Sequence, residues 1–143
     1  MGQAAQAAAA RLNAERAETL RLLGGLSDAE CRAPVEWYGR NQSVGHLLRA
    51  FTTHTLDHYQ HVIRLLQGRG RKLTEAQLLL MKAHAAQAEF SALVGSLSDE
   101  AFEETGPNSE DWSAGQVLEH VLDNERRYRE AILAALGKGA ATP

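Results

Sequence analysis

The chain is poor in the features that define several classes of protein. It has one cysteine, Cys31, in 143 residues and a net charge of -3. A single cysteine excludes an intramolecular disulfide framework, so we expect a reducing compartment, with the cytoplasm as the location. No hydrophobic run approaches the roughly 20 residues of a membrane-spanning helix. Because a basic surface is also missing, we expect neither a membrane nor a nucleic-acid partner.

Runs of alternating β-branched residues are absent too, and only three prolines occur. Alanine, leucine, glutamate, arginine and glutamine dominate, which predicts an all-α fold. Four long helices are predicted, at about Gln3 to Leu23, Val44 to Gln67, Glu75 to Val94 and Ala114 to Leu136. Segments 25–42 and 96–112 are expected to be long irregular linkers, each starting with Leu-Ser-Asp and a short helical turn. The linker 67-QGRGRKL is short.

Residues at the ends of these segments support the helix assignment. Ser43, Thr74 and Ser113 are candidate N-caps, and 74-TEAQ and 113-SAGQ have the spacing of a capping box. Glycines lie where the predicted helices end, and we expect them to form left-handed C-caps. These are Gly24, Gly68, Gly95 and Gly137.

The chain contains a weak internal repeat. The segment 22-LLGGLSD matches 93-LVGSLSD at an offset of 71, and 43-SVGHLL matches 113-SAGQVL at an offset of 70. We infer two helix pairs related by a pseudo-twofold axis, with halves of about 3–67 and 74–137. Together they predict a single domain over residues 1–143.

Three of the six histidines lie in the stretch 54-HTLDHYQH-61. His54 and His58 are one turn and about 40° apart around a helix, so both imidazoles can approach one point. They lie on the flank of an apolar stripe, where a neighbouring helix would pack. His61 lies nearer to solvent and His46 lies off this side. The pair fits either metal chelation or ordinary helix packing.

The fourth predicted helix adds a histidine and a carboxylate. His120 follows Trp112 by eight residues, on the flank that corresponds to the histidine pair. Glu125 falls inside the apolar stripe, where a buried carboxylate needs a cation, a hydrogen-bond donor or a cavity. An ion pair with Arg49 or Arg127 explains Glu125 equally well.

The Trp-Ser, Val-Leu-x-His and Glu residues of segment 112–125, with the His-x-x-x-His helix, resemble the DinB/YfiT-like superfamily of small four-helix bundles. The resemblance spans nearly the whole chain. It implies an up-down-down-up bundle with a metal held by His54, His58 and His120. Family members with known activity include S-transferases and isomerases that use low-molecular-weight thiols such as bacillithiol or mycothiol.

The order of the ligands departs from the family pattern. The family has the single histidine in the second helix and the pair in the fourth, whereas here the pair comes first. A site across a pseudo-twofold axis can take either part from either half. The complementary positions, Ala50, Asn124 and Tyr128, offer no set of ligands, so we expect at most one metal per chain. The link 67-QGRGRKL spans at most about 24 Å and normally would join antiparallel neighbours.

Three neutral imidazoles leave coordination positions open on a divalent metal, as in catalytic rather than structural sites. The hypothesis is a metal-dependent enzyme, similar to a thiol S-transferase, an isomerase or a hydrolase, that activates a thiol or water for attack on a small electrophile. Glu125 or Tyr128 would handle the proton. Asp57 and Asp123 are candidate acceptors for the imidazole N–H groups. Zinc, nickel and iron all suit imidazole, so the identity of the metal stays open.

The expected partners are a small-molecule substrate, with a low-molecular-weight thiol as one option, and a second copy of the chain, since related bundles often dimerise. The alternative hypothesis is a noncatalytic helical module that binds a metal or ligand and acts through protein association. Cys31 lies in a linker with no histidine fixed beside it, so we expect a packed or idle thiol.

Overall fold

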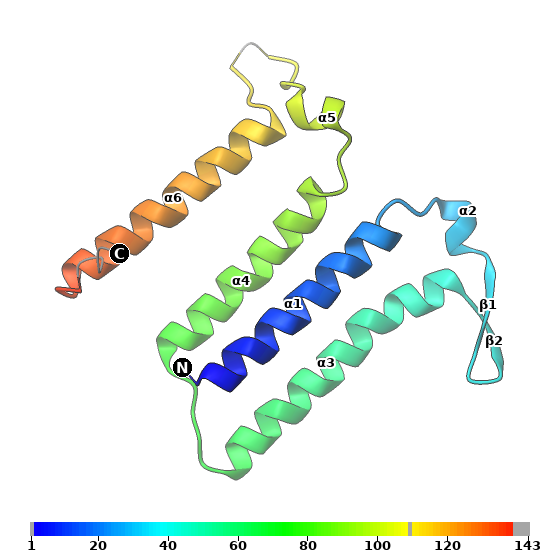
Figure 1. Ribbon diagram of the computed structural model, residues 1–143, viewed down its shortest axis with the longest axis horizontal. Coiled ribbons are helices and arrows are strands. Elements are labelled where there is room, and N and C mark those ends of the chain that lie inside the picture. The colour runs from blue at the N-terminus through cyan, green and yellow to red at the C-terminus, as the bar shows by residue number, and fades with distance from the viewer. Residues whose placement is uncertain (1, 109, 139–143) are drawn as a thin grey trace. The chain divides into compact units, whose positions relative to one another are not determined.

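The computed structural model describes residues 2–108 and 110–138, so both ends of the predicted domain 1–143 lie outside the described residues. The chain divides into two compact units, Met1–Ala88 and Glu89–Pro143. The elements are, in order (Figure 1), α1 (Gln3–Leu23), α2 (Asp28–Cys31), β1 (Pro34–Trp37), β2 (Arg40–Ser43), α3 (Val44–Gly68), α4 (Glu75–Val94), α5 (Asp99–Glu103) and α6 (Ala114–Ala135).

The predicted helical class is confirmed in its main features. The bounds of α1 and α4 agree with the prediction, and α3 and α6 each differ from it by one residue at the C-terminal end. The two predicted short turns are also present, as α2 and α5. Among the described residues, no helix combines the length and apolar character needed to cross a membrane.

The predicted N-caps form as hydrogen-bonded structures. The Ser113 hydroxyl accepts from the Gln116 N–H at 3.2 Å, and the Gln116 side chain accepts from the Ser113 N–H at 2.9 Å. Thr74 and Gln77 form the same reciprocal pair, and the Ser43 hydroxyl accepts from the N–H of His46. Each cap gives a partner to a backbone N–H that the first turn of a helix leaves free.

The short helix α2 has a capping box of its own, between Ser27 and Glu30. The Ser27 hydroxyl and backbone N–H both donate to the Glu30 carboxylate, which holds its pKa below the ordinary value. Because the folded pKa is lowered, this contribution to stability is present at neutral pH and is lost as the pH falls through the folded pKa. The equivalent helix α5 is capped by Ser98, 71 residues after Ser27.

The internal repeat has a structural counterpart where each short helix meets the next long helix. A Cβ atom on Gly45 would lie 3.1 Å from the backbone oxygen of Cys31. On Gly115, a Cβ would lie 3.0 Å from the Phe102 ring. Both glycines come two residues after the N-cap serine of a long helix, so the same close approach is made in both halves. Cys31 is half-buried at this contact.

The expectation that residues 25–42 form an irregular linker is wrong from residue 34 onward, where β1 is followed by β2. These residues form an antiparallel hairpin in which Trp37 pairs with Arg40. Tyr38 and Gly39 make the two-residue turn, with φ of 49° and 69°. Positive φ at both positions is typical of a type I′ turn, whose twist suits a hairpin. Next to the hairpin, the N–H of Val44 donates to the backbone oxygen of Ala33. The hairpin was hard to predict from the sequence, because its strands have only four residues and its turn contains a tyrosine.

Three of the four predicted glycine C-caps are also wrong. Gly24 has a right-handed helical φ of -65°, Gly68 is the last residue of α3, and Gly95 does not have positive φ. Gly137 does adopt the left-handed conformation, with φ of 63°, and Gly70 does so after α3. Beyond Gly70 and Gly137, the N–H groups of Arg71 and Lys138 reach back to Leu66 and Leu133, which is the Schellman pattern.

Apolar side chains of α1 and α3 border one cavity within the first unit. Leu20 and Leu23 of α1 and Leu48 and Phe51 of α3 border a cavity of about 160 Å³. The Arg16 guanidinium lies 5.8 Å from the centre of the Phe51 ring, within the range of a cation–π contact. Leu48 and Phe51 of the apolar stripe predicted on α3 therefore lie close to α1.

Replacing Ser113 by alanine is expected to lower the free energy of unfolding by about 0.5–2 kcal/mol, because the N-cap acceptor is lost. Ser113 is suited to this test since its exposure is only 4%. Ser91→Ala is the matched control, because Ser91 is an exposed interior residue of α4 and alanine is the better helix former. Urea denaturation measures both variants, and equal stability of the two would contradict the capping role.

Candidate functional site

The histidine pair of α3 has the arrangement that its spacing predicts. The ring centroids of His54 and His58 are 4.5 Å apart, and the rings meet edge to face at 79°. The centroids of His58 and His61 are 6.4 Å apart. All three side chains are exposed within their unit. His54 and His58 are therefore the two imidazoles that approach each other most closely on this helix.

On α6, His120 has two neighbours that fix its ring. Its centroid lies 5.0 Å from that of Trp112, with the two rings edge to face at 68°. The Asn124 amide nitrogen lies 2.9 Å from His120 Nε2 and also donates to the His120 carbonyl oxygen at 2.9 Å. The spacing of eight residues between Trp112 and His120 thus corresponds to a direct ring contact.

The predicted triad takes ligands from both units, because His54 and His58 belong to the first and His120 to the second. Within residues 2–108 and 110–138, no group of three or more histidine, cysteine, aspartate or glutamate side chains is arranged to hold a metal ion. The pair and His120 each offer imidazole donors that suit a divalent transition metal. Their convergence on one ion stays a prediction.

The predicted proton-handling and supporting residues have different surroundings. Glu125 and Tyr128 are both exposed on α6, with 66% of Tyr128 accessible. Asp123 accepts from Arg126 at 3.0 Å and lies 3.6 Å from Arg127. Arg127, considered above as a partner for Glu125, therefore pairs with Asp123. Asp57 is exposed on α3.

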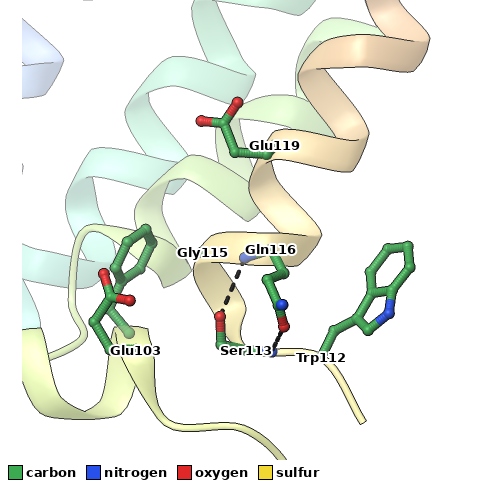
Figure 2. Close-up of a pocket in the computed structure, with 7 residues that line it drawn as sticks. Glu103, Trp112, Ser113, Gly115, Gln116 and Glu119 are labelled. Carbon is green, nitrogen blue, oxygen red and sulfur yellow. Dashed lines mark hydrogen bonds between the residues drawn. The ribbon is translucent and has the colours of Figure 1, made fainter. Parts of the chain in front are cut away.

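A cavity of about 650 Å³ lies where α5 meets the start of α6. Phe102 and Glu103 of α5 line one side, and Ser113, Gly115, Gln116, Glu119 and Trp112 line the rest. Figure 2 shows the reciprocal Ser113–Gln116 hydrogen bonds among the lining residues, with Glu103 and Trp112 on opposite sides of them. Trp112 belongs to this cavity and also contacts His120. The cavity and the histidine are thus neighbours on one helix.

Sequence reasoning missed several residues of this region. Asn124 is one of the complementary positions named above, but its contact with His120, at the same spacing of four residues as the His54–His58 pair, was not predicted. Phe102, Glu103 and Glu119 line the cavity without a motif of their own. The available signal was the repeat, since Gly115 matches Gly45 and indicates that a short helix packs closely there.

The sequence matches no protein-family model, no curated protein and no solved structure.

We expect nickel or zinc ions to raise the melting temperature through the His54–His58 pair. Ligand that binds only the folded state adds about 2.7 kcal/mol at a concentration 100 times its dissociation constant. Thermal unfolding with and without added nickel measures this effect. His58→Ala should abolish most of the increase, whereas His84→Ala, which removes an exposed histidine from α4, should keep it. An undiminished increase in His58→Ala would contradict the role of the pair.

Proposed function

We propose that this chain is a DinB/YfiT-like metal-binding protein that activates a thiol or water for attack on a small electrophile, with the character of a thiol S-transferase. The observation that carries the proposal is the His54–His58 pair, whose rings lie 4.5 Å apart on one helix. The contact between Trp112 and His120 adds support, because both residues belong to the segment 112–125 on which the resemblance rests.

The proposal includes a four-helix bundle of up-down-down-up topology, formed by α1, α3, α4 and α6. Tyr128 and Ile132 of the apolar stripe on α6, and Leu136 directly after its end, are each more than half exposed within the structure. Exposed apolar surface costs about 25 cal/mol per Å² relative to burial, so this stripe favours packing against other helices. A bundle would provide that packing and would let α3 and α6 contribute ligands to one site.

His54, His58 and His120 are the proposed ligands. Three neutral imidazoles leave the charge of a divalent ion undiminished and keep a position open. A bound metal of this kind lowers the pKa of a thiol or water that occupies the open position. The cavity beside Trp112 provides room for a small electrophile, with aromatic side chains for its apolar part. The cavity therefore supports an enzyme over a noncatalytic module that acts through protein association alone.

Glu125 and Tyr128 are the proposed proton-handling residues. On an ideal helix, Tyr128 is about 80° around the axis from His120, whereas Glu125 is about 140° away. Tyr128 thus lies closer to the side of α6 that carries His120. Its phenol could donate a hydrogen bond to the leaving group, and the Glu125 carboxylate could accept the proton of the nucleophile if it faces the site from within the bundle.

Protein purified without a metal-affinity tag is expected to contain about one divalent metal per chain by elemental mass spectrometry. His54→Ala and His120→Ala should each lose it, because three ligands are needed for tight binding. His61→Ala is the matched control on α3 and should retain the metal. Metal that persists in both ligand variants, or its absence from the unmodified protein, would exclude the triad.

Turnover of a panel of thiols with small electrophiles is expected for the metal-loaded protein. Tyr128→Phe or Glu125→Gln should reduce the rate by about 10²- to 10⁴-fold if the residue transfers a proton in the transition state. Tyr59→Phe on α3 and Glu130→Gln on α6 make the same substitutions elsewhere and should leave the rate unchanged. A protein that binds metal but turns over no pair of substrates would instead be a noncatalytic module.

A further inference from the structure

The side chain of Asn124 makes two contacts with His120 through one atom. Its Nδ2 lies 2.9 Å from the His120 carbonyl oxygen and 2.9 Å from the ring nitrogen Nε2. A side-chain amide nitrogen carries two hydrogens, so both contacts can be hydrogen bonds at the same time. Asn124 is half-buried, one helical turn after His120, where an i, i+4 pair is expected to meet.

These contacts determine the orientation of the Asn124 amide. The oxygen and nitrogen of an amide are usually assigned from their hydrogen bonds. A backbone carbonyl oxygen can only accept, so the Asn124 atom beside the His120 carbonyl must be the nitrogen. The same nitrogen is also a donor toward Nε2, which must therefore accept with its lone pair.

The tautomer of His120 follows from this assignment. In a neutral imidazole, one ring nitrogen carries hydrogen and the other accepts. Since Nε2 accepts from Asn124, the hydrogen of His120 is on Nδ1. Neither ring nitrogen is then open to a metal ion, because Nε2 is bonded to the amide and Nδ1 is protonated. Ligation through Nδ1 would move the hydrogen to Nε2, where it would face the Asn124 N–H and break the same bond.

We propose that Asn124 is a positioning residue that closes both ring nitrogens of metal-free His120, so that a metal ion must displace its amide to use this ligand. The inference rests on the proposed role of His120 as a ligand. The Asn124–His120 bond exists only in the metal-free form. An interaction that stabilises only the metal-free protein lowers its affinity for the metal. This holds whether the metal binds Nδ1 or Nε2 of His120.

The proposal predicts the direction in which the Asn124→Ala substitution changes the affinity for the metal. Removing the amide removes a competitor for the ring, so Asn124→Ala tightens metal binding at His120. The net stability of a single hydrogen bond corresponds to a change of about 2- to 10-fold in the dissociation constant. A residue that supports a ligand in the bound form would show the opposite sign, because its loss weakens binding.

The first measurement is a long-range ¹⁵N–¹H correlation spectrum of the metal-free full chain. Mildly alkaline buffer keeps imidazoles neutral, and His120→Gln identifies the signals of His120. The unmodified protein is expected to have the hydrogen on Nδ1, and Asn124→Ala is expected to shift the population toward Nε2–H. A ring that is already mainly Nε2–H in the unmodified protein would overturn the proposal.

The second measurement is a zinc titration of the unmodified protein and Asn124→Ala. The matched control is Asn13→Ala, which makes the same substitution at an exposed position of α1. Asn124→Ala should bind zinc about 2- to 10-fold more tightly, and Asn13→Ala should bind it as the unmodified chain does. Equal or weaker binding by Asn124→Ala would overturn the proposal. If no protein binds zinc, the proposed function fails, whereas the spectrum still decides the role of Asn124.

Discussion

The close contact between each short helix and the start of the next long helix is the constraint on which the local structure depends. Gly45 and Gly115 have no room for a Cβ unless Cys31 or Phe102 moves by a few tenths of an ångström. A serine cap two residues earlier fixes where the long helix begins. Helix register follows from that start. The positions of His54 and His58 around α3, and of His120 around α6, are therefore set by a glycine and a serine that are neither proposed ligands nor proposed proton-handling residues.

The junction between the short helix and the next long helix differs between the two halves of the chain. In the second half, the corner between α5 and α6 has a cavity bordered by Trp112, and Trp112 contacts His120. In the first half, the hairpin β1–β2 lies between α2 and α3, and the histidine pair lies further along α3. The two halves of the repeat share their serine N-caps but differ in the side chains further along each long helix. They can therefore contribute different numbers of histidines to one site. This is the physical reason that the proposed triad can have its pair and its single histidine in either order.

Local features of the fold were predictable from the sequence, and contacts between segments were not. The bounds of α1 and α4 followed from helix propensity and terminal residues, and Ser43, Thr74 and Ser113 form the predicted caps. The hairpin was missed because its strands are four residues long and Tyr38 occupies a turn position that usually has asparagine or glycine. Gly24 was assigned the wrong conformation because a glycine permits left-handed φ without requiring it. The His54–His58 contact was predictable from spacing, whereas the Asn124–His120 contact needed atomic distances. Convergence of His120 with the pair depends on packing between helices, which no local pattern determines.

We propose that three histidines from α3 and α6 hold one metal ion. The most direct measurement is an anomalous difference map from crystals of the full chain grown with zinc. We expect one peak at about 2.0–2.1 Å from a ring nitrogen of each of His54, His58 and His120, with the Asn124 amide displaced from the ring of His120. A zinc peak bound by His54 and His58 without His120, or one located elsewhere in the chain, would contradict it.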